Sequence, residues 1–137
     1  MADIFDELFE RRLRGGDKGQ HQHGAIAIRV DKSMKEVYGF NQIRGYNKSI
    51  HAELDALRKC PEGIFDLYIG RLNKGCSCPC KNCIERMLRL RKHRIFIRHI
   101  YYTDGIDENG NLIITKRHFS EMNDNKDTLH ISKSYRV

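Results

Sequence analysis

Four of the five cysteines in this chain of 137 residues fall between positions 76 and 83. Cysteines so close together cannot all pair with one another, and the fifth, Cys60, offers only one distant thiol. In a reducing compartment, crowded cysteines indicate metal binding rather than disulfide bonds. The cysteine cluster therefore predicts a metal site, and the rest of the fold has to bring further ligands to it.

Cys80 and Cys83 open a segment, residues 80–93, whose apolar side chains recur at helical spacing. Residues three apart on one turn of a helix face the same side, so the two sulfur atoms converge. Pro79 suits the entry of such a helix. The N–H groups and the dipole of a helix N-terminus favour the thiolate, which is the form that binds zinc. We therefore expect Cys80 and Cys83 to be ligands of one zinc ion.

His51, Ala52 and Glu53 form a second short motif, at the start of a helix predicted over residues 50–59. At the first turn of a helix, side chains can converge beyond the helix end. One imidazole and two thiolates leave the fourth tetrahedral position of zinc open, as a catalytic zinc requires. We therefore predict that His51 is the third ligand, and that Glu53 is the acid–base residue that reaches a zinc-bound water.

The cysteines allow other interpretations. Cys80 and Cys83 alone could form a redox-active pair, and together with Cys76 and Cys78 they could hold a closed structural zinc. The four are more crowded than the usual two separated pairs, and a site of four thiolates leaves the His-Ala-Glu motif unexplained. Cys78 could also line the floor of a pocket or be a small buried residue. Cys60 is expected in the core or at a helix end.

Apolar periodicity predicts alternating helices and strands. Helices are predicted over residues 2–14, 50–59 and 80–93 and near Phe119, and strands over residues 24–30, 35–40, 65–72, 95–103 and 111–117. The first two strands read as a hairpin, residues 41–49 as a loop and residues 104–110 as a turn, while the tail from about Asn123 gives no firm signal. Helices between later strands imply crossovers onto one sheet. The predicted fold is a three-layer α/β/α sandwich in one domain, residues 1–137.

A helix that opens with His-Ala-Glu, then a strand, then a helix that opens with Pro-Cys-x-x-Cys resembles the cytidine deaminase-like superfamily over about residues 24–103. The resemblance implies a mixed five-stranded sheet flanked by helices, with zinc (Zn²⁺) between the N-termini of the two motif helices. It also implies hydrolytic deamination of a nucleobase. Zinc would lower the pKa of its bound water, and Glu53 would carry protons to the ring nitrogen and to the leaving amine.

The same resemblance suggests residues that bind the substrate. Gly39-Phe40-Asn41 is similar to the family's Gly-x-Asn stretch, whose asparagine contacts the sugar or the base. Asn41 is our candidate for that role, although it could be a turn residue and Asn47 is a rival. Ala52, between His51 and Glu53, is expected to be a second substrate-binding residue.

The features of individual subfamilies leave the substrate open. Histidine as the first ligand resembles the deoxycytidylate, tRNA adenosine and polynucleotide deaminases. The short loop before His51 differs from the deoxycytidylate enzymes, and Cys78 before Pro79 differs from the tRNA adenosine enzymes. The absence of tryptophan differs from the polynucleotide enzymes. We expect a cytosine nucleoside or nucleotide, of the cytidine or deoxycytidylate type. The alternatives are a deaminase of cytosine or adenine in RNA or single-stranded DNA, and a non-catalytic structural-zinc module that binds nucleic acid.

The net charge is +7, and six basic residues lie within thirteen positions: Arg86, Arg89, Arg91, Lys92, Arg94 and Arg98. Such a cluster suggests a phosphate-bearing partner, either a nucleotide or a nucleic acid. It is equally typical of a solvated helix face. His21 and His23 form a His-x-His pair that could bind a second zinc, or lie in a solvated polar turn.

The longest apolar runs are far shorter than the roughly 20 residues that cross a bilayer, and the first fourteen residues are too charged for a secretory signal. We therefore expect a cytoplasmic protein with no membrane partner. Because members of the family it resembles commonly oligomerise, we also expect a homo-oligomer.

Overall fold

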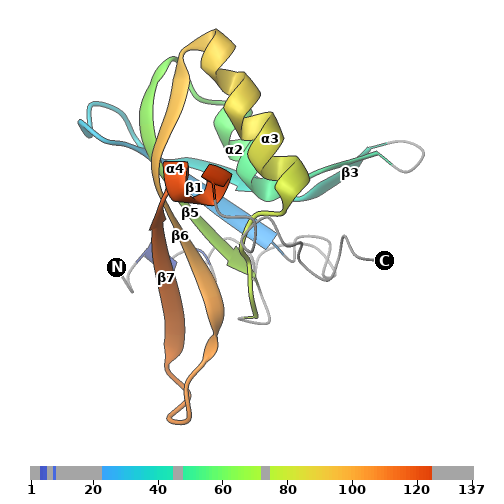
Figure 1. The fold of residues 1–137 in the computed structure, drawn as a ribbon, viewed down its shortest axis with the longest axis vertical. Coiled ribbons are helices and arrows are strands. Elements are labelled where there is room, and N and C mark those ends of the chain that lie inside the picture. The colour runs from blue at the N-terminus through green and yellow to red at the C-terminus, as the bar shows by residue number, and fades with distance from the viewer. Residues whose placement is uncertain (1–3, 6–7, 9–22, 45–47, 72–74, 125–137) are drawn as a thin grey trace.

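A computed structural model describes residues 4–5, 8, 23–44, 48–71 and 75–124. Its centre is a five-stranded sheet in the order β2-β1-β5-β6-β7 (Figure 1). The strands are β1 (His23–Arg29), β2 (Val37–Phe40), β5 (Gly63–Arg71), β6 (Ile95–Ile106) and β7 (Leu112–His118). Strands β5 and β6 are parallel, and the other neighbouring pairs are antiparallel. The sheet is therefore mixed, as predicted.

Three helices within residues 52–124 pack on one face of this sheet. They are α2 (Ala52–Arg58), α3 (Lys81–Arg89), which continues into the short 3₁₀ helix η3 (Leu90–His93), and α4 (Phe119–Asp124). Helix α3 lies on the crossover that the parallel pair β5–β6 requires. Alternate residues of a strand face opposite sides, and on β5 the side chains of Phe65, Leu67 and Ile69 join the helices in the main core. This face carries both sequence motifs.

The other face of the sheet has a smaller apolar cluster of Ile26, Tyr68 and Tyr101. The rings of the two tyrosines stack with their centroids 4.4 Å apart. Phe5 and Leu8 pack on this cluster, and both are fully buried. Apolar groups thus cover both faces of the sheet, in agreement with the layered fold. Most of the helix predicted over residues 2–14 lies outside the described residues.

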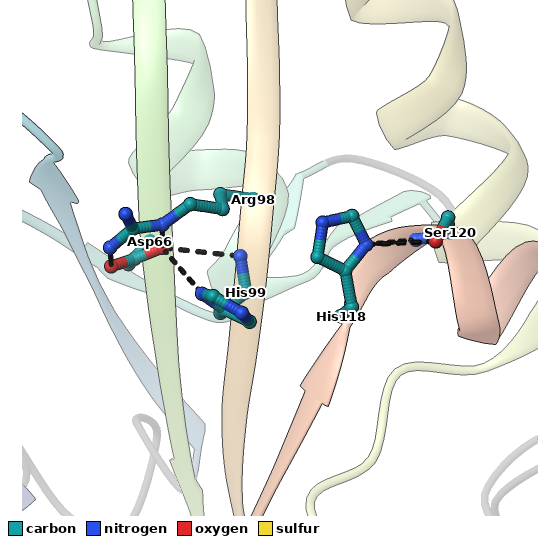
Figure 2. A network of polar contacts seen from close by, with 5 residues as sticks. All are labelled: Asp66, Arg98, His99, His118 and Ser120. Carbon is teal, nitrogen blue, oxygen red and sulfur yellow. Dashed lines mark hydrogen bonds and ion pairs between the residues drawn. The ribbon is translucent and has the colours of Figure 1, made fainter.

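The parallel register of β5 and β6 shifts at Asp66, which has two residues of β6, Arg98 and His99, opposite it. The Asp66 carboxylate accepts hydrogen bonds from Arg98 Nε (3.0 Å), from an Arg98 terminal nitrogen (2.6 Å) and from the His99 backbone N (3.1 Å) (Figure 2). A bulge leaves backbone donors without ladder partners, and Asp66 satisfies one of them. Arg98, within the strand predicted over residues 95–103, lies on β6 and forms an ion pair with Asp66.

Two segments predicted as irregular form strands. The predicted loop of residues 41–49 contains β3 (Gln42–Arg44) and most of β4 (Lys48–Ile50), which pair antiparallel as a hairpin that extends away from the sheet (Figure 1). Residues 104–106, predicted as turn, prolong β6, and the turn follows at residues 107–111. Neighbouring strands can pair through their backbones without apolar alternation, so periodicity does not reveal such extensions.

None of the described helices has the length and apolar character that a membrane-spanning helix needs.

Candidate metal centre and active site

The structure brings His51, Cys80 and Cys83 together, with their ligand atoms all within 4.8 Å of one another. Cys83 Sγ lies 3.1 Å from His51 Nδ1. In a tetrahedral zinc site, Zn–S and Zn–N bonds of about 2.3 and 2.1 Å would place these two atoms about 3.6 Å apart. The group therefore needs only a small opening to hold a metal ion. Within the described part of the chain it is the one such group of histidine, cysteine and acidic residues.

Two helix starts supply these residues. His51 is the residue immediately before α2, and Cys80 is the residue immediately before α3, with Cys83 in the first turn. Cys80 Sγ accepts a hydrogen bond from the Cys83 backbone N at 3.4 Å. The hydrogen bond from the Cys83 thiol, together with this backbone donor, lowers the pKa of Cys80 to about 7. A thiolate is thus accessible near neutral pH, as metal binding requires.

Helix α2 is held in place by a close approach to β2. A Cβ atom on Gly39 would lie 2.3 Å from Ala56 N and 2.4 Å from Ala52 O, both of them backbone atoms of α2. The Asp55 carboxylate accepts hydrogen bonds from Phe40 N and from Lys59 Nζ, each at 3.0 Å. Only glycine at position 39 lets the strand come this near. Sequence reasoning missed this role, although a glycine inside a predicted strand often marks a close backbone approach.

Helix α3 is held differently, by a buried hydroxyl in the segment that precedes it. Ser77 Oγ accepts a hydrogen bond from Thr103 N (2.9 Å) and donates one to Ile69 O (2.8 Å). The Thr103 hydroxyl donates to Gly75 O at 2.9 Å. Ser77 and Thr103 are both buried. These bonds fasten residues 75–77 to the ends of β5 and β6, and so fix where Cys80 begins α3. Nothing in the local sequence pattern marked Ser77 or Thr103.

Glu53 lies in the first turn of α2 and is 6% exposed. Burial raises the pKa of its carboxyl to about 7, and the charge of Cys80 contributes in the same direction. The hydrogen bond to Cys80 and burial raise the pKa of Cys83, and the charge of Glu53 adds to them, so the carboxyl is within electrostatic range of the thiols. A carboxyl that titrates near neutral pH can both accept and donate a proton. Ala52, beside it, is buried with its side chain in the main core.

Asn41, the candidate substrate-binding residue, follows directly after β2. Its side-chain Oδ1 accepts a hydrogen bond from His23 N at 3.1 Å, and its own backbone N donates to His23 O at 3.3 Å. The residue before it, Phe40, is bonded to Asp55 in α2. Asn41 is therefore held at the edge of the sheet, next to the first turn of α2. Its rival Asn47 lies outside the described residues.

The remaining cysteines stay outside the metal group. Cys76 is exposed and Cys78 is half-buried against the main core, and neither has its sulfur within reach of the cluster. The geometry therefore does not bring together a site of four thiolates. Cys60 is buried just after α2, where its thiol donates to Ala56 O at 3.3 Å, as expected for a core position at a helix end.

The position of His23 differs from expectation. His23 is the half-buried first residue of β1, so the prediction of a solvated turn is wrong for it, because the strand begins earlier than the apolar run does. His21 lies outside the described residues.

The arginines of the basic cluster that follow Cys83, Arg86, Arg89 and Arg91, are exposed. The charge of Arg86 adds to burial in lowering the pKa of His51, which places this arginine near the metal group.

Comparisons with known proteins bear on the fold. No protein-family model matches the sequence, and no curated protein sequence matches it. Among solved structures, cytidine deaminase from Burkholderia pseudomallei is similar with a TM-score of 0.56 and 18% identity, covering 89% of this chain and 95% of that one. The apo dCMP deaminase of cyanophage S-TIM5 has a TM-score of 0.40 and 19% identity, covering 80% and 91%. The first likeness shows that this chain has the cytidine deaminase fold.

Proposed function

We propose that this protein is a zinc-dependent hydrolytic deaminase whose substrate is a cytosine nucleoside or nucleotide. The observation that carries the proposal is the position of Glu53. Its buried carboxyl lies in the same helical turn as His51 and within electrostatic range of Cys80 and Cys83. A structural zinc site has no use for a buried, titratable carboxyl beside its ligands. A hydrolytic site can use one as its general acid–base group.

His51, Cys80 and Cys83 are the residues that would hold zinc. One imidazole and two thiolates are typical donors for this metal, and three protein ligands leave a position for water, as in catalytic sites. When bound there, zinc supplies a water molecule whose pKa is lowered toward neutrality. The pKa of Cys80, already lowered to about 7, favours the deprotonated sulfur that the metal needs.

Glu53 would move the protons of the reaction. Its carboxylate accepts a proton from the attacking water and passes it to the ring nitrogen next to the amine-bearing carbon. It then delivers the water's second proton to the amine, which leaves as ammonia while the water oxygen remains as the new carbonyl. Because Glu53 is shielded from solvent, its raised pKa of about 7 matches both steps near neutral pH.

A second candidate function is deamination of a base within RNA or single-stranded DNA. The exposed arginines of α3, with Arg86 near the metal group, favour it. Contacts with several phosphates make binding fall steeply with salt, whereas a mononucleotide gives a shallow dependence. The salt dependence of substrate binding therefore separates the two candidates.

The test is ammonia release from cytidine, deoxycytidine, their phosphates, adenosine and oligonucleotides. We expect Glu53→Gln to retain zinc and the thermal unfolding midpoint but to lose at least about a hundredfold in rate, the usual contribution of a general acid–base group. Glu85→Gln is the matched control, because Glu85 is exposed on α3, and it should retain full activity. Near-normal turnover in the Glu53 variant would remove this residue from the mechanism.

A further inference from the structure

Three residues form a row along the edge of the sheet beside the metal group. Asn41 follows the end of β2, His23 begins β1 and Arg71 ends β5. The antiparallel pairing of β1 and β5 sets His23 opposite Arg71. Two hydrogen bonds, of 3.1 and 3.3 Å, join His23 to Asn41. The order of the strands therefore places the three residues side by side.

This row adjoins the start of α2. Phe40, next to Asn41, donates its backbone N–H to Asp55, and the Asp55 backbone N–H donates to His51 O at 2.9 Å. Electrostatics agree with this placement. Burial lowers the pKa of His23, and together with the charges of Arg71 and His51 brings it to about 4. His23 is thus within electrostatic range of both the arginine and the metal ligand.

Arg71 has a donor that the described structure leaves unpaired. Its Nε is buried, yet it has no hydrogen-bond partner. Among the ion pairs of the described residues, none includes Arg71. By contrast, Arg98 on β6 is paired with Asp66 through two of its guanidinium nitrogens. A buried donor without an acceptor costs free energy. The unpaired Nε of Arg71 therefore points to an acceptor that arrives with a ligand.

We propose that Arg71, with His23 beside it, binds the phosphate of a nucleotide substrate, so that the enzyme prefers phosphorylated substrates to free nucleosides. The inference rests on the proposed function, which places the base at the metal group. A sugar separates base from phosphate, so the phosphate site should lie beside the metal rather than at it, as Arg71 does. The planar guanidinium suits phosphate oxygens in particular. Asn41, bonded to His23 and next to Phe40, which bonds to Asp55 in α2, is placed to contact the sugar.

The test measures binding of deoxycytidine 5′-monophosphate and of deoxycytidine to the zinc-loaded Glu53→Gln protein by calorimetry. The phosphorylated compound should bind more tightly. Adding Arg71→Met should weaken its binding about 10- to 100-fold, the usual effect of losing a hydrogen bond to a charged group, and leave deoxycytidine binding unchanged. Arg71→Lys should retain part of the difference. Equal weakening of both compounds, no weakening of either, or no binding of either would overturn the inference.

Two further measurements sharpen the result. Arg89→Met, on the exposed side of α3, is the matched control and should leave binding of the mononucleotide unchanged. An oligodeoxycytidine distinguishes the phosphate of a mononucleotide from the phosphodiester of a strand. Arg71→Met should weaken binding of the oligonucleotide more than binding of the mononucleotide only if the site is built for a phosphodiester. If the wild-type protein discriminates between the two compounds but releases ammonia from neither, the proposed function fails while the phosphate site stands. Ammonia release without an effect of Arg71→Met would support the proposed function and overturn the phosphate site.

Discussion

The two helices that carry the metal-binding residues are held by opposite means. Helix α2 is fixed by the absence of a side chain at Gly39, which lets backbone meet backbone. Helix α3 is fixed by the presence of one at Ser77, whose buried hydroxyl ties the preceding segment to β5 and β6. The first contact is steric and cannot yield, whereas the second consists of hydrogen bonds that water can partly replace when the segment opens. The metal group therefore has one rigid half and one more adjustable half.

The largest expected effect is that of Gly39→Ala. The new Cβ would overlap Ala56 N and Ala52 O, both backbone atoms, so α2 has to move as a unit. We expect a loss of at least about 4 kcal/mol in the free energy of unfolding, in the range that marks severe disruption, measured by denaturant titration. The control is Gly110→Ala, where nothing lies within 4 Å and only the φ of +82° opposes a side chain. That variant should lose about 1–2 kcal/mol. A Gly39→Ala protein as stable as this control would contradict the rigid contact.

Removal of zinc should have the next largest effect, because the metal joins the two halves. With free zinc about 1,000-fold above its Kd, the metal adds about 4 kcal/mol to the free energy of unfolding. We expect a chelator to remove this increment, as seen in thermal unfolding. Cys80→Ala should show no increment at all. Cys76→Ala, which alters an exposed thiol outside the metal group, should keep it in full. The reverse pattern would indicate that a different set of thiols holds the metal.

Ser77→Ala tests the adjustable half. It leaves Thr103 N and Ile69 O without their partners in a buried setting, which should cost about 2–3 kcal/mol and weaken zinc binding through displacement of Cys80. Ser120→Ala removes an exposed hydroxyl that contacts His118 and should change stability by less than about 0.5 kcal/mol. If the Ser77 variant bound zinc as tightly as the parent, the hydroxyl would not position α3.

The smallest effect is expected for Asp55→Asn. The amide oxygen can still accept from Phe40 N, but the ion pair with the half-exposed Lys59 is lost. We expect a cost of no more than about 1 kcal/mol, as for a partly solvated pair. Lys59→Met should cost a similar amount, and the double variant no more than either single one. Fully additive losses would show that the two residues act separately.

Much of the fold follows from the sequence because its signals are local. The apolar run before Asp31 gives β1, and helical spacing of apolar residues gives α2 and α3. The two motifs lie at helix starts, where residues such as Cys80 and Cys83 necessarily share a side. The β3–β4 hairpin and the end of β6 escaped prediction because they depend on pairing between backbones. Arg98 lies on a strand as predicted, but its pairing with Asp66 depends on the bulge between β5 and β6, which no local pattern reveals.

The sequence by itself thus determined which residues are suited to bind a metal and to move protons: His51, Glu53, Cys80 and Cys83. Their chemistry and their places at helix starts are properties of the residues and their nearest neighbours. Only the tertiary structure decided that Gly39 and Ser77 position the two helices, and that Arg71 lies beside His23 at the same edge. The reason is that each of these roles is a relation between residues far apart in the chain, set by strand order and register.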